Sequence, residues 1–248
     1  MMNCVPDSIS ILGTRVSVLE SYDDAVRLIR ERILSRLPTF CVAINPEKVY
    51  RARKDPGLSR VLESADIGIC DGVGVSLASM LLYRKRLARC TGVDLFLRLV
   101  HLSARDGLKV FVLGASPESN GTACRVLLDR FPGLKIVGSE DGYFKDSAAV
   151  VAKINQSGAE LLFVALGSPR QEYWIAEQMP HLKTSFCMGV GGSLDVVSGV
   201  AKRAPALFRK TGTEWLFRLL SQPSRIRRQM ALPLFTLDVL REIVAIKH

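Results

Sequence analysis

The chain has 248 residues, 48% of them apolar and 23% charged, and a formal net charge of +10. This length and apolar content suffice for a large domain with a buried core, and they exclude an intrinsically disordered protein. The longest stretch without charge, 72–83, is far shorter than the roughly 18 residues of a membrane-spanning helix. The N-terminus has neither a basic region nor a long apolar run, so we expect a cytosolic protein without a secretory leader.

Short apolar runs rich in β-forming residues alternate with longer stretches of helical periodicity. After a predicted hairpin (residues 9–12 and 14–19, flanking Gly13) and a helix at 22–35, buried strands are expected at 39–45, 66–70, 109–113, 134–138, 160–166 and 184–188. Pro46 and Pro56 suit first helical turns, and Thr91 with Asp94 resembles a capping box. Repeated strand–helix units predict an α/β fold with a mostly parallel sheet and helices on both faces.

The strand pattern stops near residue 200. This predicts a large α/β domain at 1–200 and a helical appendage at 201–248. The appendage has ten Lys or Arg against three acids, whereas the first 200 residues are nearly balanced with 24 bases and 21 acids. Such asymmetry indicates an anionic partner for the appendage: a membrane, a nucleic acid or a phosphorylated substrate. The alternative is a solvated basic face.

Cysteine and histidine offer little for chemistry. Six cysteines and three histidines are scattered along the chain, and no two cysteines form a C-x-x-C pair. We therefore expect neither a disulfide framework nor a metal site, and no cofactor is predicted.

Polar and glycine residues follow every predicted strand of the sheet. Ligands of open α/β sheets bind beyond the carboxyl ends of the strands, so a ligand cleft explains this repetition better than six ordinary turns. The residues concerned are Asn45, Asp71-Gly72, 114–118 beginning at Gly114, 141–144, 167–172 with Gln171, and 189–192 with Gly191 and Gly192, followed by Asp195.

Glycine turns that lead into helices suit phosphate groups, because helix N-termini present free N–H groups. The chain nevertheless lacks G-x-G-x-x-G, the P-loop pattern and a D-x-D metal motif. A metal-free diphosphate site that uses backbone amides and Arg or Lys is the interpretation that fits. Asp71, beside Gly72, is the candidate general base for an attacking hydroxyl; its alternative role is the N-cap of the helix that follows.

The segment 213–230 interleaves Trp215, Phe217 and aliphatic residues with arginines. Such a segment suits a lipid headgroup layer, and its basic residues favour an anionic leaflet. The alternative is a helix that packs its aromatic rings on the domain and turns its arginines to water.

These segments together resemble the WecG/TagA/CpsF family of bacterial glycosyltransferases, from about Ile9 to the C-terminus. The matching motifs are AINPEK (43–48), CDGVG (70–74), RCTGVD (89–94), GSEDGYF (138–144), GSPRQE (167–172), GVGGSLD (189–195), KRAP (202–205) and EWLFRLLSQPSRIRRQ (214–229). The tail and the Asp-Gly-Tyr-Phe element look closest to the enterobacterial-common-antigen branch, which transfers N-acetylmannosaminuronic acid.

The resemblance implies a Rossmann-like catalytic domain, metal-independent inversion, a UDP-sugar donor and a polyprenyl-diphosphate-linked GlcNAc acceptor. It also implies a peripheral position on the inner face of the cytoplasmic membrane. Carried onto this chain, the roles are Asp71 as base, Asn45, Gln171 and the Gly191–Asp195 loop as donor contacts, Arg89 as a diphosphate ligand, and Arg218, Arg225 and Arg228 as the basic residues of the appendage.

One departure affects the donor: the teichoic-acid branch has Thr where this chain has Ala43. N-acetylmannosaminuronic acid is the favoured sugar, and UDP-ManNAc and UDP-glucose stay open, as does assembly into a homo-oligomer. Two other classes compete: an NAD-dependent oxidoreductase, which lacks its glycine fingerprint here, and a basic nucleic-acid-binding protein, which leaves the strand ends unexplained. The prediction is an enzyme that binds no nucleic acid.

Overall fold

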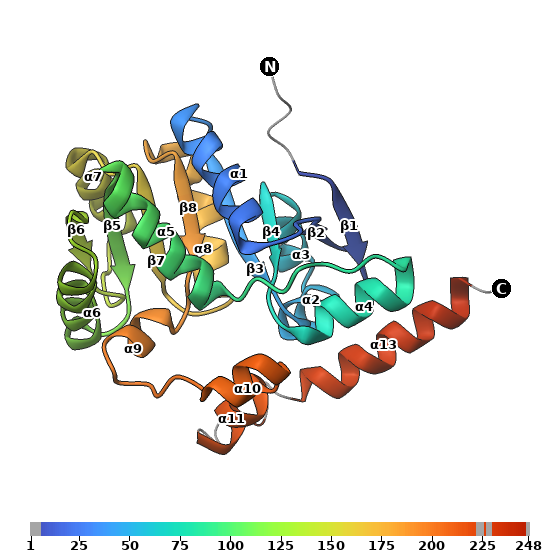
Figure 1. Cartoon of the computed structure of the whole chain (residues 1–248). Coiled ribbons are helices and arrows are strands. Elements are labelled where there is room, and N and C mark those ends of the chain that lie inside the picture. Colours follow the sequence, from blue (N-terminus) through green and yellow to red (C-terminus); the bar gives the residue numbers. More distant parts are fainter. Residues whose placement is uncertain (1–5, 222–225, 227–229, 247–248) are drawn as a thin grey trace.

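A parallel β-sheet forms the centre of the computed structural model, which describes residues 6–221, 226 and 230–246, and only the backbone of Lys210, Arg218, Ser221 and Ile246. In this described part, six parallel strands adopt the order β4-β3-β8-β7-β5-β6 (Figure 1). In chain order they are β3 (Thr39–Ile44), β4 (Ile67–Cys70), β5 (Lys109–Gly114), β6 (Lys135–Glu140), β7 (Leu161–Ala165) and β8 (Phe186–Gly189). Each matches a strand predicted from the sequence, with ends shifted by one or two residues.

Helices cover both faces of this sheet, so the predicted Rossmann-like α/β architecture is confirmed. One face carries α1 (Tyr22–Leu34), α5 (Gly92–Asp106), α6 (Pro117–Arg130) and the short α9 (Ser193–Val197). The other face carries α2 (Pro46–Ala52), α3 (Pro56–Glu63), α4 (Val73–Tyr83), α7 (Ser147–Ser157) and α8 (Arg170–Gln178), which a 3-10 turn (Met179–His181) follows.

The strands read as continuous apolar runs because both of their faces are buried. In β3, Phe40, Val42 and Ile44 belong to the core on the α2–α3 side, while Cys41 and Ala43 belong to the core on the α1–α5 side. Side chains that alternate along a strand therefore fill two separate cores.

The local signals read from the sequence are also confirmed. The strands β1 (Ser8–Ile11) and β2 (Thr14–Ser17) form an antiparallel hairpin, whose two turn residues, Leu12 and Gly13, have φ values of 50° and 84°. Such left-handed pairs match the twist of a two-residue hairpin. Thr91 caps α5 by accepting the N–H of Asp94, and prolines occupy the first turns of α2 and α3.

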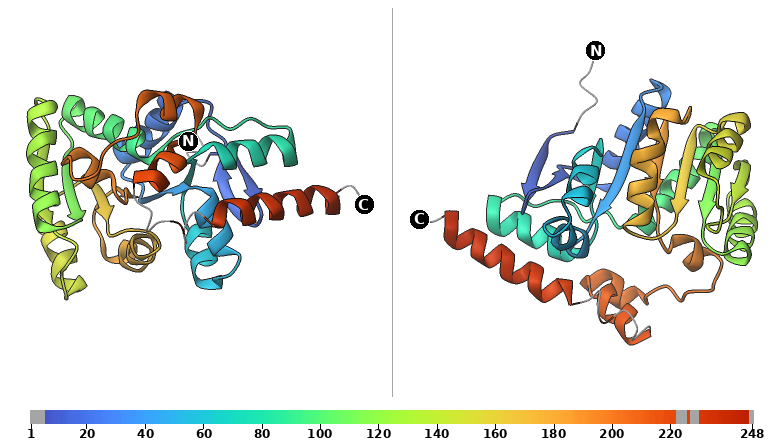
Figure 2. Two further views of the ribbon diagram at one scale, coloured as in Figure 1. Left: turned by 90° about the horizontal axis from the view of Figure 1, so that it is seen from below. Right: turned by 180° about the vertical axis from the view of Figure 1, so that it is seen from behind.

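Beyond α9, the described chain forms the helices α10 (Ala206–Thr211), α11 (Glu214–Ser221) and α13 (Ala231–Ile246). We call residues 201–248 the appendage, and Figure 2 shows its helices in orange and red along one side of the sheet domain. α13 packs on α2 and α4 through Phe235 and Val239, each 3% exposed. Among the described helices, none combines the length and the apolar content that a bilayer crossing requires.

Candidate active site

The carboxyl ends of the strands meet at one edge, because all the strands of the sheet run in the same direction. Asp71 follows β4, Asn45 follows β3 and Gly191 comes two residues after β8. These strands are consecutive in the sheet, so the three residues lie side by side. Gly114, at the end of β5, lies two strands beyond β8.

Two hydrogen bonds hold the backbone at Asp71. Its N–H donates to Ile44 O at 2.8 Å, and Cys70 O, just before it, accepts the N–H of Cys90 at 2.8 Å. A Cβ built on Gly92 would lie 3.9 Å from Asp71 Oδ2, so the carboxylate faces the first turn of α5. The N-cap residue of α4 is Gly72, one residue after the position that the alternative interpretation gave.

Two thiols flank this carboxylate and stay protonated. Burial, reinforced by the charge of Asp71, raises the pKa of Cys70 to about 12. Burial also raises the pKa of Cys90 to about 11, with Asp71 contributing against the opposing charge of Arg98. Because a thiolate and not a thiol is the nucleophile, neither cysteine is a nucleophile at neutral pH.

Asn45 caps α2, since its Oδ1 accepts the N–H of Lys48 at 2.9 Å. Gln171 is 2% exposed, and its Oε1 accepts the N–H of Gly191 at 3.0 Å. Gln171 therefore holds the loop after β8 in place through this hydrogen bond. Direct contacts of Asn45 and Gln171 with a donor remain predictions.

Gly114 and Asp195 have structural roles that the sequence did not reveal. A Cβ on Gly114, whose φ is +109°, would lie 2.5 Å from the backbone of Ala165 on β7. Glycine is therefore required by the close approach of two strands. Asp195 Oδ1 accepts a hydrogen bond from Ser119 Oγ at 2.7 Å, which ties α9 to α6. Any substrate contact of these two residues remains a prediction.

Two backbone N–H groups of the loop after β8 are already hydrogen-bonded within the protein. The N–H of Gly191 donates to Gln171, and the N–H of Ser193 donates to Val190 O at 3.1 Å. Gly192 separates them and is exposed to solvent. The amides available for a phosphate in this loop are thus fewer than the glycine pattern suggested.

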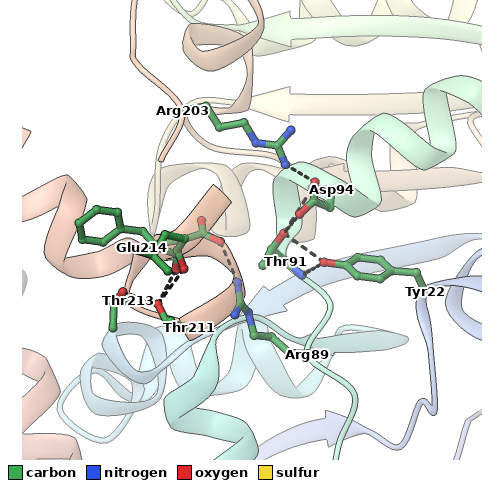
Figure 3. A network of polar contacts seen from close by, with 10 residues as sticks. Tyr22, Arg89, Thr91, Asp94, Arg203, Thr211, Thr213 and Glu214 are labelled. Carbon is green, nitrogen blue, oxygen red and sulfur yellow. Dashed lines mark hydrogen bonds and ion pairs between the residues drawn. The ribbon is translucent and has the colours of Figure 1, made fainter. Parts of the chain in front are cut away.

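Arg89 joins the catalytic domain to the appendage (Figure 3). Its Nη2 donates to Glu214 Oε1 on α11 at 2.8 Å. A second ion pair runs in the opposite sense, from Arg203 of the appendage to Asp94 of α5. Burial opposes ionisation of Asp94, but the Thr91 hydroxyl and Arg203 lower its pKa below the usual value. Glu214 and Arg203 are separated from their partners by 125 and 109 residues, so no local pattern predicts these contacts.

The arginines predicted for the acceptor lie at the limit of the described chain. Arg218 belongs to α11, but its side chain is outside the described atoms, and Arg225 and Arg228 lie outside the described residues. Within the described residues, no group of three or more His, Cys, Asp and Glu side chains gathers as metal ligands do.

A buried ion pair beneath the site was missed in the sequence. Lys48 and Glu172, whose side chains are 6% and 1% exposed, pair at 2.8 Å. Burial alone would raise the pKa of Glu172, but Lys48 together with Gln171 and Ser168 lowers it below the usual value. The available signal was a lysine and a glutamate in the first turns of helices that follow two buried strands.

Comparisons with known proteins identify the family of this chain. The model of the glycosyl transferase WecG/TagA/CpsF family matches residues 9–248. The chain is also similar to an N-acetylglucosaminyldiphosphoundecaprenol N-acetyl-β-D-mannosaminyltransferase of Bacillus spizizenii strain W23, with 38% identity over 202 residues, which are 82% of this chain and 79% of that protein. The chain therefore belongs to the WecG/TagA/CpsF family and is a glycosyltransferase.

Proposed function

We propose that the protein transfers an N-acetylmannosamine-type sugar from a UDP donor to GlcNAc carried on a polyprenyl diphosphate. The observation that carries this proposal is the position of Asp71, a carboxylate at the ligand edge of the sheet that faces the first turn of α5. The name of the Bacillus relative describes the same sugar class and an acceptor of this kind.

The proposed reaction is a single displacement with inversion at the anomeric carbon. The acceptor hydroxyl oxygen attacks that carbon, its proton passes to Asp71, and the bond from the anomeric carbon to the β-phosphate oxygen breaks. UDP leaves with the bonding electrons. Asp71 is suited to take the proton because its own N–H is bonded to the end of β3 and the carbonyl of Cys70, just before it, is bonded to Cys90, so its backbone is held in place.

The negative charge on the departing diphosphate is met by protein cations in this proposal. Arg89 is the candidate that the family resemblance assigns, and Cys90, the next residue, donates its backbone N–H to Cys70 O beside Asp71. An arginine fork matches phosphate geometry and stabilises developing charge in a water-poor site.

Chelation should leave the reaction intact. Millimolar EDTA is expected to change the initial rate of sugar transfer by less than about twofold, because the proposed charge stabilisation comes from arginine and not from a divalent ion. Rates measured with EDTA and with added Mg²⁺ or Mn²⁺ check this. A rate that collapses on chelation and returns with one metal would contradict the metal-free mechanism.

A donor panel tests the function as a whole. The purified protein is incubated with a GlcNAc-diphospholipid and UDP-ManNAc, UDP-N-acetylmannosaminuronic acid or UDP-glucose, and the lipid product is analysed by mass. The sequence motifs favour the uronic acid, whereas the name of the relative favours ManNAc. Failure to transfer any mannosamine-type sugar, combined with binding of NAD or of RNA at physiological salt, would overturn the proposal.

We further propose that the appendage holds the enzyme on the inner face of the cytoplasmic membrane. On α13, Leu237, Leu240 and Val244 are 43%, 51% and 57% exposed and lie on the side opposite the buried Phe235 and Val239. α13 itself has one Arg and two acids, but the appendage as a whole has ten Lys or Arg against three acids. An amphipathic helix with such an outer stripe, in this basic appendage, suits an anionic leaflet. This stripe lies beyond the segment 213–230 and supports membrane binding of the appendage over a solvated basic face.

Polar substitution of this stripe should weaken vesicle binding. Burying half of a leucine side chain contributes roughly 1 kcal/mol, so Leu237→Gln with Leu240→Gln should reduce partitioning roughly 30-fold. Co-sedimentation with vesicles that contain anionic lipid measures it. Leu34→Gln with Leu128→Gln is the matched control, because these leucines are 56% and 43% exposed on α1 and α6. Equal losses in both double variants would contradict the assignment of the stripe.

A further inference from the structure

A continuous chain of buried polar groups runs beneath the proposed donor site. Lys48 Nζ donates to Ala43 O at 2.7 Å and pairs with Glu172 Oε1 at 2.8 Å. The same Oε1 accepts from Gln171 Nε2 at 2.8 Å, and Gln171 Oε1 accepts the N–H of Gly191 at 3.0 Å. Lys48, Gln171 and Glu172 are 5%, 2% and 1% exposed. We call these three residues the buried relay.

The buried relay spans the place where two central strands part. β3 pairs with β8 only from Thr39 to Cys41, although it stays paired with β4 to Ile44. β8 stays with β7 as far as Gly189. At the carboxyl edge, the end of β3 and the loop after β8 are thus joined through side chains in place of backbone pairing.

Stability alone explains the buried relay poorly. Removing two charges from water costs about as much as their attraction returns, and an apolar pair of similar volume often stabilises a fold equally well. What an ion pair adds is direction, since each donor and acceptor fixes the position of its partner. Here the fixed partners are Ala43 O, two residues before Asn45, and the N–H of Gly191.

We propose that Lys48 and Glu172 are positioning residues that set the distance between the two walls of the donor site. One wall carries Asn45 and, on the next strand, Asp71; the other carries the loop from Gly191 to Asp195. The inference rests on the proposed function, because it assigns the donor to this edge. Lys48 and Glu172 act through Ala43, Gln171 and Gly191, and being buried they touch no substrate themselves.

The test is the double variant Lys48→Met with Glu172→Gln, which removes both charges and nearly keeps the volume. Because a displacement of the order of 1 Å costs about 100-fold in rate, kcat/KM for the UDP-sugar should fall about 100-fold, with a rise in KM and in the Kd for UDP. Initial rates and calorimetric titration with UDP measure both quantities. The matched control is Arg32→Met with Asp66→Asn. This pair, at 2.9 Å, joins the N-terminal ends of β3 and β4, at the edge of the sheet opposite the site.

The single variant Lys48→Met gives a readout that lost stability alone does not. Glu172 then lies buried without its cation, so its pKa rises, and its neutral form fits the site better than its charged form. Relative to wild type, the activity of Lys48→Met should increase as the pH falls from about 8 to about 5, and the added Glu172→Gln change should remove this pH dependence.

The inference is overturned if the double variant binds UDP and turns over like wild type, or if it loses no more activity than the Arg32/Asp66 control at equal melting temperature. A wild-type protein that binds no UDP would instead overturn the proposed function. The two failures are therefore distinguishable in one set of titrations.

Discussion

Replacement of Asp71 by asparagine should abolish sugar transfer while leaving UDP binding nearly unchanged. Asparagine keeps the shape of the side chain and lacks only the ability to take the proton of the acceptor hydroxyl. General-base catalysis contributes about 10²- to 10⁴-fold, so kcat should fall by at least that factor. Initial rates with the lipid acceptor, and calorimetry with UDP, measure the two effects separately.

Asp106→Asn is the control for this change, because Asp106 is a carboxylate at the opposite end of α5 that pairs with Arg30 and Arg105. It should keep its activity. Turnover of Asp71→Asn within a few-fold of wild type would exclude Asp71 as the base. Loss of UDP binding together with turnover would point to a role for Asp71 in holding the donor.

Gly114→Ala is expected to unfold much of the protein at moderate temperature. The new Cβ would lie 2.5 Å from both Ala165 C and Ala165 O, so β5 and β7 would have to separate in the middle of the sheet. A residue other than glycine at a φ of +109° adds backbone strain. Strain of about 1–3 kcal/mol and overpacking of about 1–3 kcal/mol together predict a loss of roughly 2–6 kcal/mol. Thermal and urea unfolding measure it.

Gly121→Ala makes the same chemical change inside α6, where an added Cβ meets nothing within 4 Å. Alanine favours a helix over glycine by about 0.5–1 kcal/mol, so this control should be slightly more stable than wild type. If Gly114→Ala were as stable as Gly121→Ala, then the requirement for glycine at the end of β5 would have to come from the ligand.

The fold was largely readable from the sequence because its strands are buried on both faces. Runs such as residues 110–113 and 161–166 are apolar throughout, and glycine, proline and capping residues separate them from the helices. Strand order was not readable. β8, the last strand of the described chain, lies between β3 and β7, and this insertion depends on how helices pack across the whole sheet.

The sequence predicted which edge of the sheet carries the site, but it did not predict the role of each side chain there. Asp71, Asn45 and Gly191 come together because their strands are neighbours. Gly114 resembled a ligand residue because close strand approach and close ligand approach select glycine alike. The Arg89–Glu214 pair was invisible, since no local periodicity links residues 125 positions apart.

The two ion pairs between catalytic domain and appendage have opposite polarity, and this has a consequence for assembly. Arg89 presents a cation to the anion Glu214, and Asp94 presents an anion to the cation Arg203. Each pair is partly exposed and adds little to stability. A docking that exchanged the two contacts would set arginine against arginine and carboxylate against carboxylate. The polarity of the two pairs therefore favours one orientation of the appendage on the sheet domain and disfavours the reverse orientation.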